Sequence, residues 1–141
     1  MPSAPKPAAR PPRKPRGTAN VNRGETELKL GRKSYRMRPS YEAIVAIEEQ
    51  LGRSTVELLR ASNGMALSYV EMATIATELI RAGADAKDEQ ARNASVERIG
   101  ELIFEEGTAA VYVALTVVLA SAVSGGRAAS GEAKPVAATT G

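Results

Sequence analysis

The sequence predicts an α+β domain that is mostly α-helical, with a short N-terminal β-hairpin followed by about four to five helices. Polar and apolar residues alternate over residues 25–38, which is typical of paired strands with one buried face. In several segments between Tyr41 and residue 106, apolar residues recur every three to four positions, which is typical of helices. Between the two patterns, Pro39 cannot donate a ladder hydrogen bond. We therefore expect strand to give way to helix at this proline.

Length and composition limit the size and kind of core. With 141 residues the chain has room for one ordinary domain, and one Phe with no Trp leaves the core to Leu, Ile, Val and Ala. The expected organisation is a disordered basic leader over residues 1–22, a hairpin plus helical domain over residues 23–124, and a disordered tail over residues 125–141. The absence of Cys excludes disulfides and fits a reducing cytoplasm.

The net charge of +3 is distributed unevenly. Residues 1–23 contain six cations and no anion, whereas residues 40–124 contain six cations and thirteen anions. The leader is rich in Pro, Ala, Arg and Lys, and it lacks the large apolar residues that would offset the entropy of ordering. It is either a solubilising segment without a partner or a weak binder of nucleic acid or of an acidic surface. No apolar run follows its charges, so it does not resemble a secretory signal.

The predicted hairpin pairs residues 25–30 with residues 34–38 around Gly31-Arg32-Lys33. Its apolar face is expected to hold Leu28, Leu30, Tyr35 and Met37, and its other face Lys29, Arg36 and Arg38. Two strands alone are barely stable. The apolar face should therefore lie on the helices or join the sheet edge of a neighbour.

The first helix is predicted over Tyr41 to Leu51. Ser40 is placed to cap its N-terminus, and Gly52 falls where a left-handed C-terminal cap belongs. The spacing puts four residues on its apolar side and turns Glu48 and Glu49 outward. These four are Tyr41, Ile44, Ile47 and Leu51.

Two capping boxes predict the next two helices. Ser54 with Glu57 opens a short helix that ends at Asn63-Gly64, and Ser68 with Glu71 opens a longer one that ends near Gly83. The longer helix has apolar residues at helical spacing, namely Met72, Ile75, Leu79 and Ile80. Residues 84–94 are polar without periodicity, so a linker or a frayed turn is expected there.

Residues 95–106 predict an amphipathic helix. Val96, Ile99, Leu102 and Ile103 form its apolar side. On the other side, Glu97, Glu101 and Glu105 recur every four residues and make an acidic stripe. Such a stripe is either a solvated face or a docking surface for a basic partner.

Residues 108–123 are the most apolar part of the chain and contain no charge. As a helix they would span about 24 Å, which is less than the roughly 30 Å of a bilayer core, so a buried helix is expected instead of a membrane span. A helix that is apolar all round must be covered all round. Either it is central or another chain covers part of it, and the latter predicts a partner or self-association surface. The residues proposed for that surface are Val111, Leu115, Val118 and Leu119.

The sequence offers no constellation for catalysis. The absence of His removes the commonest general base and transition-metal ligand. Adjacent carboxylates such as Glu48-Glu49 and Glu105-Glu106 point about 100° apart on a helix and cannot share a proton. The glycines are scattered and form no phosphate-binding loop. We therefore expect no catalytic residue, no cofactor and no metal site, and a protein that is not an enzyme.

The dense motif at residues 23–52 resembles a known family. The motif consists of six parts that occur in this order: Arg23-Gly24-Glu25-x-Glu27-Leu28-x-Leu30, Gly31-Arg32, Tyr35, Arg38-Pro39-Ser40-Tyr41-Glu42-Ala43-Ile44, Ile47-Glu48 and Leu51-Gly52. This run is similar to the tail assembly chaperone family of phages and gene transfer agents, and the resemblance extends over about residues 22–122. The matching corner residues are expected to be architectural. They are Arg38, Pro39, Ser40, Tyr41, Ile44 and Ile47.

The resemblance implies a non-enzymatic chaperone that binds the tape measure protein and helps the tail tube protein to assemble. It implies that this happens in the cytoplasm of the host cell. We also expect the protein to form homo-oligomers and not to bind a membrane. One alternative is a structural tail tube component retained in the particle. A second alternative is a nucleic-acid accessory protein that binds through Lys6, Arg10, Arg13, Lys14 and Arg16.

Overall fold

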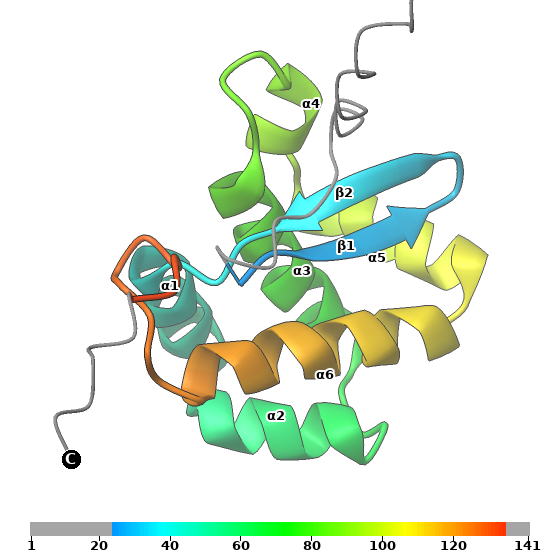
Figure 1. Ribbon diagram of the computed structural model, residues 1–141. Coiled ribbons are helices and arrows are strands. Elements are labelled where there is room, and N and C mark those ends of the chain that lie inside the picture. Colours follow the sequence, from blue (N-terminus) through cyan, green and yellow to red (C-terminus); the bar gives the residue numbers. More distant parts are fainter. Residues whose placement is uncertain (1–23, 135–141) are drawn as a thin grey trace, which may run out of the picture.

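The computed structural model describes residues 24–134, so the predictions for residues 1–22 and for the last seven residues lie outside the described part. Within it, a two-stranded antiparallel hairpin precedes six helices, which confirms the predicted fold class (Figure 1). The elements are β1 (Thr26–Leu30), β2 (Lys33–Met37), α1 (Tyr41–Leu51), α2 (Thr55–Asn63), α3 (Tyr69–Gly83), α4 (Glu89–Arg92), α5 (Val96–Glu106) and α6 (Ala109–Val123).

The hairpin closes with a two-residue turn, Gly31-Arg32, because Leu30 pairs with Lys33. Gly31 has a φ of 64° and Arg32 has no positive φ, which is the pattern of a type II′ turn with Gly at its first central position. The apolar face is the predicted one. Leu28, Leu30, Tyr35 and Met37 are all buried, and they lie on α6 and α3.

The corner between strand and helix has the predicted caps. The Ser40 hydroxyl accepts a hydrogen bond from the Ala43 amide (3.2 Å), and the amide of left-handed Gly52 donates to the Glu48 carbonyl (2.8 Å). The predicted apolar side of α1 was partly wrong. Ile47 is buried, but Tyr41 is 69% exposed. Tyr41 is the first residue of the helix, and most of its side chain faces solvent in the described part of the chain.

Glu48 was predicted to face outward, and the structure corrects this. Its Oε2 accepts hydrogen bonds from the Thr55 amide (2.8 Å) and from the Thr55 hydroxyl (2.9 Å). A carboxylate at a helix N-terminus is stabilised by the free amides and by the helix dipole. Glu48 therefore joins the end of α1 to the start of α2.

The helix starts at Ser54 and Ser68 are confirmed. The Ser68 hydroxyl accepts from the Glu71 amide and the Glu71 carboxylate accepts from the Ser68 amide, so this capping box is complete. The Ser54 hydroxyl accepts from the Glu57 amide and also contacts the Glu57 carboxylate. The expected linker over residues 84–94 contains the four-residue helix α4, which Asp88 caps.

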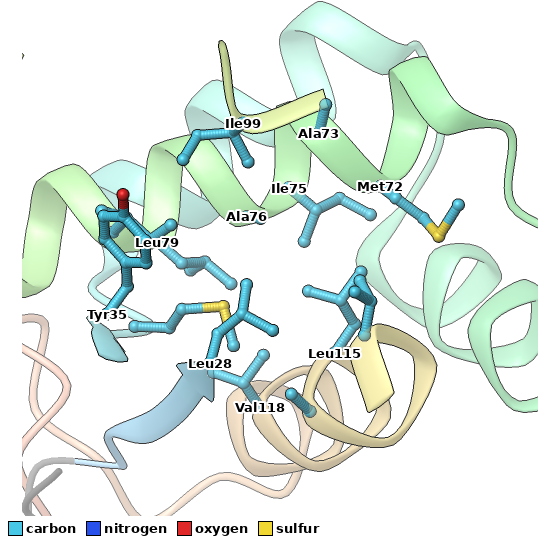
Figure 2. Packing of buried hydrophobic residues seen from close by; sticks show 14 of the residues in the cluster. Leu28, Tyr35, Met72, Ala73, Ile75, Ala76, Leu79, Ile99, Leu115 and Val118 are labelled. Carbon is cyan, nitrogen blue, oxygen red and sulfur yellow. The ribbon is translucent and has the colours of Figure 1, made fainter. Parts of the chain in front are cut away.

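Helix α6 is central to the fold. It lies between α2 on one side and β1 on the other, and it also contacts α3 (Figure 1). Figure 2 shows Leu115 and Val118 pointing from α6 toward Leu28 and Ile75. The strongly apolar helix is thus covered mostly by its own chain, which keeps most of its large apolar side chains from water.

The C-terminal segment was predicted to be disordered from residue 125, and the structure corrects this for residues 125–134. The Ala129 carbonyl accepts from the Tyr41 amide (2.8 Å), and the Ser130 carbonyl accepts from Arg38 Nε (2.6 Å). An isolated bridge joins Arg127 to Ala133. The Ala129 carbonyl satisfies the free amide at the start of α1, and the segment closes over the corner beside this helix (Figure 1).

Candidate partner-binding groove

Exposed apolar side chains gather where α3 and α5 meet. Phe104 is 70% exposed, Val70 is 66% exposed and Tyr69 is 44% exposed. Single exposed apolar residues are normal on protein surfaces, but adjacent ones in a hollow mark interaction sites. The junction of α3 and α5 is therefore the candidate site.

These side chains line a groove of about 780 Å³, called here the α3–α5 groove. Its lining is mainly apolar, with carboxylates along α5. The residues are Tyr69, Val70, Ala73, Val96, Glu97, Gly100, Glu101, Phe104 and Glu105.

Small residues let the two helices approach closely beneath the groove. A Cβ added at Gly100 would lie 3.4 Å from the Ala73 Cβ, so the backbones are nearly in contact there. The complete cap at Ser68 fixes the start of α3 and places Tyr69 and Val70 in its first turn. The groove thus has a floor of small side chains between taller apolar walls.

An aromatic pair joins the two walls. The ring centroids of Tyr69 and Phe104 are 5.6 Å apart, with an angle of 57° between the ring planes. Tilted pairs at this separation are favourable, by about 0.5–1.5 kcal/mol beyond the area that they bury. The pair holds two exposed rings in place, so a partner that packs on them needs to order little side-chain motion.

The α5 wall is acidic. Glu97, Glu101 and Glu105 are exposed along it, which confirms the predicted outward stripe. Among the residues that line the groove none is Lys or Arg; the nearby Arg98 lies 3.8 Å from Glu101 through Nη1 and Oε2. The groove therefore combines apolar contact with negative charge, and it favours a partner segment that carries cations beside small or apolar residues.

The residues predicted for a partner surface on α6 are not at the surface. Val111, Leu115, Val118 and Leu119 are each at most 1% exposed, because α2, β1 and α3 cover them. They are core residues of the fold, and this corrects the assignment. The exposed large apolar side chains of α6 are Val113 (67%), Val117 (53%) and Val123 (40%), and the first two lie one helical turn apart.

The corner residues are brought together around the C-terminal loop. Pro39, Tyr41 and Ile44 line a hollow of about 320 Å³ with Ala122, Gly125 and residues 127–129. The Arg38 amide donates to the Leu79 carbonyl (2.9 Å), and Ile47 is buried. The corner residues thus connect the hairpin, α1 and the C-terminal loop.

The sequence pattern did not predict Tyr69, Val70 and Phe104 as surface residues. A signal existed for Phe104. It follows Glu97 by seven positions and Glu101 by three, so it lies on the acidic side of α5 and not on the side of Ile99 and Ile103. A large aromatic residue on the polar side of an amphipathic helix indicates contact with something outside the helix pair.

Residues 24–134 contain neither a metal-binding cluster nor a helix that could cross a membrane. No group of three or more metal-binding side chains is arranged to hold a metal ion in this part of the chain. None of its helices combines the length and the apolar character needed to cross a membrane.

Comparison with known protein families matches residues 23–125 to a family described as phage tail tube protein, GTA-gp10. A search of curated proteins and a search of solved structures returned no significant match. The match spans more than half of the chain and includes the hairpin, the corner and all six described helices. Its description supports a tail protein of a phage or gene transfer agent, and it does not name an assembly chaperone. The chain therefore belongs to the family of phage tail tube protein, GTA-gp10.

Proposed function

We propose that this protein is a non-enzymatic structural component of the tail tube that stays in the finished particle. The observation that carries the proposal is the match of residues 23–125 to a family described as a tail tube protein. A subunit of a repeating tube works by contacts with other subunits. The α3–α5 groove supplies an apolar and charged surface for such a contact.

The absence of His and Cys from the whole sequence supports a role without catalysis. The carboxylates of the groove wall are exposed and lie side by side along α5, so they do not converge on a point where a substrate atom would react. We propose that assembly proceeds by binding equilibria alone, in the cytoplasm of the host cell.

A second candidate is an assembly chaperone that binds the tape measure protein and leaves as the tube forms. The shape of the groove favours this candidate, since a hollow between two helices can take the apolar face of a third helix. Competing tube subunits could then displace the client by mass action.

Mass spectrometry of purified particles separates the two candidates. A tube component is expected in gradient-purified particles at a copy number similar to that of other repeated tail proteins. If peptides from residues 24–134 are found in the cell lysate but not in the particles, the structural proposal is wrong. Co-purification of the tape measure protein from that lysate would then support the chaperone.

A further inference from the structure

The α3–α5 groove has a charge that the domain itself leaves uncompensated on its α5 wall. Glu97, Glu101 and Glu105 are all exposed, and the one ion pair formed by them in the described part is the 3.8 Å contact of Glu101 with Arg98. Exposed pairs of this kind contribute little. A ligand with several cations would therefore find free carboxylates beside an apolar floor.

The leader of this chain has the complementary chemistry. Residues 5–16 contain five Pro and five Lys or Arg, and they contain no anion. Proline-rich segments bind between aromatic side chains because they lose little conformational entropy on binding, and Tyr69 and Phe104 provide such an aromatic wall. The cations at Arg10, Arg13 and Arg16 are spaced three residues apart, so they can follow a row of carboxylates.

The groove of a neighbouring copy is easier to reach than the groove of the same copy. A side chain at Gly31 would start 3.7 Å from Glu106 Oε1, so the tip of the hairpin lies beside the C-terminal end of α5. Gly24 lies just before the other end of β1. It is about 23 Å from Gly31, because each of the seven steps between them adds about 3.3 Å along an extended strand. The eight steps from Arg16 to Gly24 span at most about 29 Å. A path within one copy would use most of this length only to reach the tip of the hairpin.

We propose that residues 5–16 of one copy bind in the α3–α5 groove of the next copy, with prolines on Tyr69 and Phe104 and arginines beside Glu97, Glu101 and Glu105. Each copy then offers one leader and one groove. Such a contact is head-to-tail and can extend through many copies, as a repeating tail requires. This inference rests on the proposed function because it supplies a contact between tail subunits.

Sedimentation of the full-length protein tests the contact. The wild-type mass should rise with protein concentration, and the association should weaken as salt rises and screens the exposed charges. Two triple variants should each stay monomeric, with association weaker by about tenfold or more. One is Glu97→Lys, Glu101→Lys, Glu105→Lys, and the other is Arg10→Glu, Arg13→Glu, Arg16→Glu. The control Glu27→Lys, Glu42→Lys, Glu49→Lys reverses three exposed charges away from the groove and should associate as the wild type does.

Mixing the two triple variants gives the sharpest result. One variant keeps the wild-type leader and the other keeps the wild-type groove, and the two reversed surfaces are also opposite in charge, so mixing should restore the association that each variant lacks alone. A wild-type protein that is monomeric at all concentrations, or a mixture that does not associate, would overturn the proposal. It would also fail if the leader variant lost DNA binding but kept self-association, since the leader would then serve nucleic acid. None of these outcomes affects whether the protein is found in particles.

Discussion

Tyr112 and Leu67 form two hydrogen bonds with each other in the buried interior. The Tyr112 hydroxyl donates to the Leu67 carbonyl (2.9 Å) and accepts from the Leu67 amide (3.2 Å). The phenol thus satisfies both backbone groups of a residue in the connection between α2 and α3. It fixes this connection to α6, and so it helps to keep α6 inside the fold.

We expect Tyr112→Phe to destabilise the protein by about 1–3 kcal/mol, because it leaves the Leu67 amide and carbonyl buried without partners. Urea unfolding measures the change. Tyr41→Phe is the matched control, since Tyr41 is 69% exposed and its hydroxyl forms no hydrogen bond within residues 24–134. Equal stability of Tyr112→Phe and wild type would contradict the assigned role.

Gly83 allows α3 to pack closely on β2. A Cβ added there would lie 2.3 Å from the Arg36 carbonyl oxygen, which is a backbone atom and cannot turn away. We expect Gly83→Ala to cost about 1–3 kcal/mol through overpacking. The control Gly100→Ala meets only the Ala73 methyl at 3.4 Å and gains helix propensity. Thermal melting should rank Gly83→Ala well below Gly100→Ala, and the reverse order would be inconsistent with this packing.

Thr77 is fully buried in α3, and its hydroxyl has no hydrogen-bond partner among the described residues. Burying an unpaired hydroxyl costs free energy. We therefore expect Thr77→Val to raise the free energy of unfolding by about 1 kcal/mol. Chemical denaturation of the two proteins provides the comparison. A loss of stability would show that the hydroxyl makes a contact that this structure does not contain.

Acid should destabilise the protein through Glu71 and Asp88. The Ser68 amide, followed by Arg53, lowers the pKa of Glu71 below its ordinary value of 4.5. The Ala91 amide, followed by Lys33, lowers the pKa of Asp88 below 3.8. A lowered pKa in the folded state means that folding favours the charged form. This stabilisation is complete above the unfolded-state pKa values and is lost as pH falls through the folded-state values.

Unfolding followed from pH 7 down to pH 3 tests the two carboxylates. Stability should be constant from neutral pH to about pH 5 and should fall below it. Glu71→Gln keeps a side-chain acceptor in the capping box but cannot titrate, so its stability should fall less steeply with acid. An unchanged slope in this variant would assign the acid sensitivity to other groups.

The local structure could be predicted from the sequence because its signals are local. The serines at residues 40, 54, 68 and 95 cap helices through their own hydroxyls, and the Pro39 corner follows from backbone chemistry. The place of α6 could not be predicted in this way. An all-apolar helix has no polar side to show which neighbour covers it, and packing between distant elements decides this.

The groove was only partly visible in the sequence. The acidic stripe on α5 could be predicted from its four-residue spacing, but the groove needs Tyr69 and Val70 from the start of α3 beside it. That contact depends on the close approach of Gly100 to Ala73, which periodicity does not show. The C-terminal loop was missed for a similar reason, since its Gly and Ala residues are held by backbone hydrogen bonds to Arg38 and Tyr41.

The central claim is that this tail protein works through its α3–α5 groove. Electron microscopy of particles from cells that carry Phe104→Ser measures it most directly, with Tyr41→Ser as the control because the two side chains are 70% and 69% exposed. We expect the Phe104→Ser protein to fold normally. The number of particles with full-length tails should nevertheless fall by about tenfold, because the contact loses an aromatic anchor. Tyr41→Ser should leave this number unchanged. Normal tails with a folded Phe104→Ser protein would contradict the account.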